Sequence, residues 1–180
     1  MKIRLLLPAL AAALVSFHAQ ALDLLPAGAF VQGGAATQRS YSATAGVFWP
    51  WAWRRDTAHG EWTGITELFV SHWSADTGAG REGLTQVGLL PLLRYNFARG
   101  TGSWFAEAGI GISAMDQTYR TEDKQFSSRF NFVDVLGVGR SFGAQGRSEL
   151  GLRLSHVSNA GIKKPNPGEN FVQLRYAVRF

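Results

Sequence analysis

The chain has 180 residues, of which 46% are apolar and 17% charged, and it contains 21 glycines, 12 phenylalanines and no cysteine. This length suits one domain. The formal net charge is +5 with no long basic run, so the composition gives no sign of nucleic-acid binding. The absence of cysteine excludes a disulfide framework, a thiolate nucleophile and a cysteine metal site. Low charge combined with many glycines and aromatic residues is unusual for a soluble domain.

The N-terminal segment has the three parts of a secretory signal peptide. It begins with Lys2 and Arg4, continues with the apolar run 5–17 and ends in His-Ala-Gln-Ala, an Ala-x-Ala type of cleavage site. The apolar run is too short for a membrane-spanning helix, which needs roughly 20 residues. We therefore expect residues 1–21 to be a signal peptide and residues 22–180 to be the mature domain.

Beyond the signal peptide, apolar residues alternate with polar or small residues at a period of two, the pattern of strands with one apolar face. The last segment is the clearest case, because every even position from Val172 to Phe180 is apolar and the positions between include Gln173, Arg175 and Arg179. In chain order, we expect eight strands near residues 28–34, 40–52, 61–73, 84–97, 103–114, 126–142, 148–158 and 170–180.

The polar face of these segments decides between a soluble and a membrane protein. It combines glycine with arginine and glutamate, which suits the tight, ion-paired interior of a small membrane barrel better than a solvated surface. Eight is an even strand number, as in bacterial barrels. The expected fold is therefore an all-β, eight-stranded antiparallel transmembrane β-barrel in the bacterial outer membrane. A soluble sandwich with a core of aromatic residues is the alternative.

The connections of such a barrel alternate between its two ends. Outer loops are expected around residues 33–40, 74–83, 115–125 and 159–169, and inner turns around 54–60, 98–102 and 143–146. Aromatic residues then gather near the inner rim, as in the girdle of a membrane barrel: Trp49, Trp51, Trp53, Trp62, Tyr95, Phe97, Trp104, Phe142 and Phe180.

His156 and Ser158 are the strongest candidates for chemistry. Strand parity places both on the same outward face as Leu154, near the outer end of the strand. Polar residues that face lipid call for a functional explanation. Because they are separated by two positions along a strand, their Cα atoms should lie about 7 Å from each other. The pair can supply a base and a nucleophile, while a histidine that only binds a lipid head group is the alternative.

Residues 155–170 read Ser-His-Val-Ser-Asn-Ala-Gly-Ile-Lys-Lys-Pro-Asn-Pro-Gly-Glu-Asn and resemble the signature of the PagL family, outer-membrane lipid A 3-O-deacylases. The signal peptide, the length, the eight strands and the terminal phenylalanine extend this resemblance to the whole chain. The resemblance implies a serine esterase that cleaves the 3-linked acyl ester of lipid A. Ser158 would be the nucleophile, His156 the general base, and Asn159 with the backbone N–H near Gly161 the oxyanion donors.

The third member of the triad has two candidates. The family pattern places a glutamate fourteen residues after the histidine, where this chain has Asn170, with Glu169 one position earlier. Parity favours Asn170, which shares the outward face with Val172. Charge favours Glu169, because a carboxylate stabilises an imidazolium better than an amide does. Both alternatives stay open at this point.

The remaining expectations concern ligands and partners. Lys163 and Lys164 either hold lipid A phosphates or are solvated loop lysines. No cofactor and no metal are expected; Asp116, Glu122 and Asp123 are a weaker calcium-site alternative without regular ligand spacing. The expected partners are lipid A or lipopolysaccharide as substrate and outer-membrane lipid, with a homodimer as a candidate assembly and no nucleic acid. The rival function is a non-enzymatic small barrel of structural or adhesion type.

Overall fold

The structure is a computed structural model that describes residues 25–37, 39–97 and 104–180. The expected signal peptide, residues 1–21, lies outside the described residues and stays a prediction. The expected inner turn at 98–102 also lies outside them. Within the described ranges, no helix is long and apolar enough to cross a bilayer.

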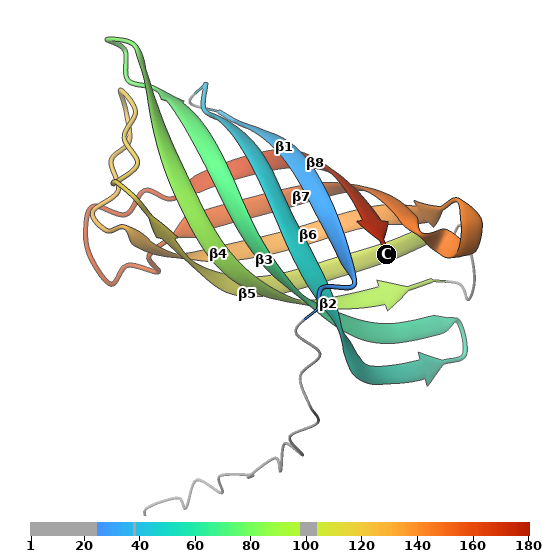
Figure 1. The fold of residues 1–180 in the computed structure, drawn as a ribbon. Coiled ribbons are helices and arrows are strands. Elements are labelled where there is room, and N and C mark those ends of the chain that lie inside the picture. The colour runs from blue at the N-terminus through green and yellow to red at the C-terminus, as the bar shows by residue number, and fades with distance from the viewer. Residues whose placement is uncertain (1–24, 38, 98–103) are drawn as a thin grey trace, which may run out of the picture.

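Eight antiparallel strands form a closed barrel in which each strand pairs with its sequence neighbours and β1 pairs with β8 (Figure 1). The strands are β1 (Gly28–Ala36), β2 (Tyr41–Thr57), β3 (Gly60–Asp76), β4 (Arg81–Asn96), β5 (Trp104–Met115), β6 (Phe130–Phe142), β7 (Ser148–Ser158) and β8 (Glu169–Arg179). The strand number and the antiparallel closure confirm the predicted fold class.

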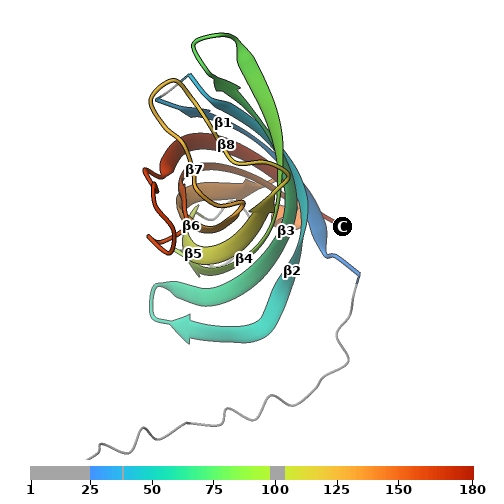
Figure 2. The same cartoon turned by 90° about the vertical axis from the view of Figure 1, so that its left-hand side faces the viewer.

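The connections fall at two rims, as predicted. One rim carries the β1–β2, β3–β4, β5–β6 and β7–β8 connections, and we call it the loop rim (Figure 1). The opposite rim carries the C-terminus and the β2–β3 and β6–β7 connections, and we call it the turn rim. Figure 2 shows the barrel closing around its interior, with the β2–β3 hairpin projecting beyond the wall. The site discussed below lies at the loop rim.

Two predicted boundaries differ most from the structure. Most of the segment 54–60, predicted as a turn, is strand, because the β2–β3 ladder resumes after a register shift between Pro50 and Arg54 and continues to the Thr57–Gly60 pair. Bulges shift strand register without ending the sheet. The sixth strand begins at Phe130 instead of near residue 126, since the preceding segment folds back on itself through a bridge between Arg120 and Gln125.

The outer face of the barrel is apolar, as period two predicts. The even positions of β7 and β8 show this clearly, because at least half of the surface of each of these residues is exposed on the outside of the barrel: Leu152, Leu154, Val172 and Leu174. In a membrane barrel this face contacts lipid. Exposed aromatic residues gather near the turn rim, at the strand ends and around the β2 bulge, as a girdle would: Trp51, Trp53, Trp62, Phe97, Trp104, Phe142 and Phe180.

The lumen is closed by a network of buried ion pairs. Glu107 bridges Arg94 and Arg153, with its carboxylate oxygens 2.8 and 2.7 Å from their guanidinium nitrogens. Glu67 joins Arg153 to Arg175, and Glu149 joins Arg94 to Arg175. Three buried carboxylates therefore balance three buried guanidinium groups, so the interior carries paired charge and leaves no open channel through this part of the barrel.

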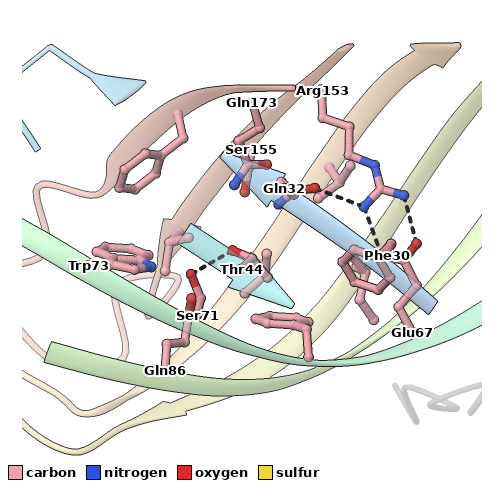
Figure 3. Close-up of a pocket in the computed structure, with 16 residues that line it drawn as sticks. Phe30, Gln32, Thr44, Glu67, Ser71, Trp73, Gln86, Arg153, Ser155 and Gln173 are labelled. Atoms are coloured by element: carbon pink, nitrogen blue, oxygen red, sulfur yellow. Dashed lines mark hydrogen bonds and ion pairs between the residues drawn. The ribbon is translucent and has the colours of Figure 1, made fainter. Parts of the chain in front are cut away.

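Between this network and the loop rim lies a small polar cavity inside the barrel. Figure 3 shows Arg153 bound to Glu67 on one side and Ser71 bound to Thr44 on the other; the hydroxyl oxygens of the second pair are 2.7 Å apart. The cavity volume is about 20 Å³, room for about one water molecule. A lipid cannot enter such an interior, so a lipid substrate must reach the protein from outside.

Candidate active site

The end of β7 carries the two residues that the sequence singled out. Alternation continues along β7 from the exposed Leu154 to His156 and Ser158 on the same face. His156 is half-buried and Ser158 is only 9% exposed, although both belong to the outward face. The β7–β8 connection, residues 159–168, passes close to the strand end, where Gly168 lies against the His156 ring. The predicted pair therefore lies in a partly covered position at the loop rim, which we call the recess.

The structure joins His156 to Asn170. The two residues are direct partners in the β7–β8 ladder, and His156 Nδ1 lies 2.7 Å from Asn170 Oδ1. Because an amide oxygen can only accept, this contact places a proton on Nδ1 and leaves Nε2 as the acceptor, the tautomer that a general base requires.

Glu169 has a different position. Strand parity turns it into the barrel, where it is fully buried; its Oε2 accepts a hydrogen bond of 2.6 Å from the Tyr119 hydroxyl and its Oε1 lies 3.1 Å from Lys124 Nζ. Burial, and then the hydrogen bond to Glu169, raise the pKa of Tyr119, which keeps this hydroxyl a neutral donor. Glu169 thus ties the β5–β6 connection to β8 and faces away from His156.

Ser158 lies directly before a tight turn. Its Oγ accepts a hydrogen bond of 3.4 Å from the backbone N–H of Ala160, and Ala160 and Gly161 both have positive φ values, 54° and 77°. His156 and Ser158, both within the described ranges, are not hydrogen-bonded to each other. Contacts between a base and its nucleophile are often longer in enzymes without substrate and tighten when substrate binds.

Asn159 is 2% exposed and holds this turn together. Its Nδ2 donates to the hydroxyls of Ser127 and Ser128 and to the Lys163 carbonyl, while its Oδ1 accepts from the Gly161 N–H at 3.0 Å. Both predicted oxyanion donors therefore already have acceptors: the Gly161 N–H binds Asn159 Oδ1, and Asn159 Nδ2 binds the two serines and the Lys163 carbonyl. The two serines come from the β5–β6 connection, and no local sequence signal pointed to them.

Gly168 is a third site residue that the sequence did not single out. It has a φ of 66°, and a Cβ built on it would lie 2.5 Å from His156 Cε1. Glycine adopts this left-handed conformation without strain and lets the backbone pass directly over the imidazole. A glycine after a proline, just before a strand, was the available signal. The connection thus forms a lid over one face of His156.

A surface groove runs from this recess down the lipid-facing wall. Asp134, His156 and Asn170 lie side by side at its polar end, on β6, β7 and β8. Its apolar part is lined by Leu136, Leu154 and Val172. The groove therefore joins titratable groups to a hydrocarbon-like surface, an arrangement that accommodates a lipid with an ester near its head group.

The residues predicted to bind lipid A phosphates or calcium lie in two connections of the loop rim. Lys163 and Lys164 are exposed in the β7–β8 connection. In the described ranges, no group of three or more acidic or histidine side chains comes close enough to hold a metal ion. Asp116, one of the calcium candidates, accepts a hydrogen bond from the Thr85 N–H at 2.9 Å.

Together, the apolar outer wall, the ion-paired lumen and the polar recess open to the wall define a membrane β-barrel with a lipid-facing site. The model of the lipid A 3-O-deacylase (PagL) family matches residues 39–179. The chain is 37% identical to lipid A deacylase PagL of Pseudomonas aeruginosa, over 96% of this chain and 97% of that protein. It is 40% identical to lipid A deacylase PagL of Bordetella bronchiseptica, over 63% of this chain and 61% of that protein.

A solved crystal structure described as the outer membrane enzyme PagL superposes with a TM-score of 0.77 at 31% identity, covering 86% of this chain and all of that one. The chain therefore belongs to the PagL family of lipid A 3-O-deacylases, as the resemblance of residues 155–170 indicated.

Proposed function

We propose that Ser158, His156 and Asn170 are the catalytic residues with which this lipid A 3-O-deacylase hydrolyses the 3-linked acyl ester of lipid A. The observation that carries the assignment is the 2.7 Å contact between His156 Nδ1 and Asn170 Oδ1 at a recess on the lipid-facing wall. It supplies an oriented base two residues from a hydroxyl on the same strand face, which is the arrangement of an activated nucleophile.

In the proposed reaction, Ser158 Oγ attacks the ester carbonyl while its proton passes to His156 Nε2. The tetrahedral intermediate then collapses, His156 gives the proton to the oxygen that leaves on the sugar, and the acyl chain remains on Ser158. A water molecule loses a proton to His156 and attacks the acyl-enzyme. Collapse of the second intermediate releases the fatty acid, and the proton on His156 returns to Ser158 Oγ.

The developing oxyanion needs donors next to Ser158. We assign this role to the side-chain amide of Asn159 and the backbone N–H of Gly161, which sit in the turn that follows the nucleophile. Here the Gly161 N–H donates to Asn159 Oδ1, and Asn159 Nδ2 donates to Ser127, Ser128 and the Lys163 carbonyl, so hydrogen bonds of both donors must open when substrate binds. The Ala160 N–H, 3.4 Å from Ser158 Oγ, already points toward the reacting atom. Donors held in place before the reaction starts are what makes such a site effective.

Lipid A would approach sideways from the outer leaflet, because ion pairs fill the lumen. Its acyl chain would lie in the groove between Leu136, Leu154 and Val172, and its phosphates would meet Lys163 and Lys164 at the water interface. This orientation places the loop rim at the outer surface. A homodimer of the barrel stays a prediction.

The assignment is tested with Ser158→Ala in purified protein and detergent-dispersed lipid A. Deacylation, followed by mass spectrometry of the lipid, should fall by roughly 10³-fold or more because the nucleophile is lost. The barrel should still fold, which its heat-modifiable migration on gels reports. Ser148→Ala is the matched control, since Ser148 starts the same strand at the turn rim. Unchanged deacylation by Ser158→Ala would end the serine mechanism, and an inactive wild-type protein would support the rival structural barrel.

A further inference from the structure

Asp134 lies directly beside the proposed general base on the neighbouring strand. The β6–β7 register pairs Asp134 with His156, and the β7–β8 register pairs His156 with Asn170. Directly paired residues of an antiparallel ladder have Cβ atoms about 4.5–5.5 Å apart and share one face of the sheet. Asp134 and Asn170 therefore lie on the two strands that flank His156, on the lipid-facing wall.

The carboxylate of Asp134 has no structural role in the described part of the chain. No hydrogen bond or ion pair joins it to another described residue, and its outward neighbours on β6 are Phe132 and Leu136. The three carboxylates of the lumen network, Glu67, Glu107 and Glu149, in contrast each contact at least two arginines. An unpaired charge on the lipid-facing wall of a barrel is unfavourable, so its presence calls for a functional explanation.

Asn170 cannot supply the negative charge that a carboxylate would provide at the third position of the triad. Its amide oxygen fixes the tautomer of His156, but it is neutral and cannot balance the imidazolium that forms when Ser158 gives up its proton. Glu169 does not supply that charge, because its carboxylate faces into the barrel and binds Lys124. Of the three residues that flank the imidazole, namely Asp134, Asn170 and Gly168, Asp134 is the one that carries a negative charge.

We propose that Asp134 is a positioning residue that stabilises protonated His156 during both proton transfers. The work that one carboxylate performs in a Ser-His-acid triad is then divided between two strands: Asn170 on β8 orients the imidazole, and Asp134 on β6 provides the charge. The lipid around the groove strengthens this interaction, because the attraction between two charges grows as the dielectric constant falls. The proposal rests on the assignment of His156 and Ser158 made above.

The test moves the charge from one side of His156 to the other. Asp134→Asn should lower kcat on dispersed lipid A by roughly 10²-fold or more, because the imidazolium loses its counter-charge, and KM should change by about twofold or less. Asn170→Asp in the same chain should restore most of kcat, because it returns a carboxylate to the opposite flank. Asp134→Glu should also retain most of the activity.

Glu82→Gln, which neutralises an exposed carboxylate on β4, is the matched control and should leave kcat unchanged. Heat-modifiable migration verifies that each variant folds. Two results would overturn the proposal: an unchanged kcat in Asp134→Asn, or a loss that Asn170→Asp does not restore. Ser158→Ala, measured in parallel, separates the two assignments. If that variant is inactive while Asp134→Asn is fully active, the serine mechanism stands and only the role of Asp134 is rejected.

Discussion

At the scale of single residues, adjacent positions in β8 have opposite tasks because strand side chains alternate between two faces. Asn170 faces outward and contacts His156, whereas Glu169 faces inward and binds Tyr119 and Lys124. A shift of one residue along the strand would exchange these environments. The ladder pairing of His156 with Asn170 fixes the register. The two alternatives for the third triad position can therefore be separated by mutation.

We expect Asn170→Ala to lower kcat by roughly 10²-fold, because the imidazole loses the partner that sets its tautomer. Glu169→Gln should leave kcat within about threefold of the original value. It should instead reduce the free energy of unfolding by about 1–3 kcal/mol, since Lys124 loses a charged partner at a buried site. Lipid A hydrolysis and urea unfolding in detergent measure the two effects. The opposite ranking of kcat would mean that Glu169 orients His156.

At the scale of elements, the β7–β8 connection completes the site. It begins at the Asn159 turn, which the β5–β6 connection holds through Ser127 and Ser128, and ends at Gly168 over the imidazole. The connection is therefore anchored at both ends next to a reactive group. Such anchoring supports the position of the imidazole, which the β7–β8 ladder sets by pairing His156 with Asn170.

Gly168→Ala tests the lid. The new Cβ would lie 2.5 Å from His156 Cε1, so the imidazole or the backbone must move, and we expect kcat to fall by roughly 10-fold or more. Gly143→Ala is the control, because Gly143 also has a positive φ, 76°, but the closest atom to its Cβ is 3.8 Å away. Both variants carry a strain of about 1–2 kcal/mol from the left-handed backbone. Equal kinetics in the two variants would show that the contact with His156 has no importance for catalysis.

At the scale of the whole molecule, the barrel separates stability from activity. Its lumen contains the ion-pair network of Glu67, Glu107 and Glu149 with the buried arginines, and its outer wall carries the site. The strand wall lies between them, with inward and outward side chains on alternate residues. A change in the lumen should therefore alter folding much more than the chemistry.

Glu107→Gln tests this separation. It leaves Arg94 and Arg153 short of one negative charge in a buried site, and we expect the free energy of unfolding to fall by about 3–5 kcal/mol. The folded fraction should keep its kcat. Urea titration followed by tryptophan fluorescence, together with kinetics at low urea, measures both quantities. A large loss of kcat in the folded barrel would show that the lumen and the site are coupled.

The sequence by itself determined the strand number, the apolar outer wall and the outward face of His156 and Ser158. All three depend on side-chain alternation, which is local and has a period of two. The family resemblance of residues 155–170 likewise depended on a short contiguous motif. The ends of the strands were predicted less accurately than their number. At the β2–β3 hairpin, for example, the register shift and the extension of the ladder depend on pairing with the neighbouring strand.

Only the tertiary structure decided which residues meet across strands and connections. Asn170 reaches His156, Glu169 reaches Tyr119, and Asp134 lies beside His156 because ladder registers set these pairs. Register depends on pairing between strands that are separated by connections of variable length, such as the one between Met115 and Phe130. Alternation predicts the face on which a side chain lies, but barrel closure and register determine its partners.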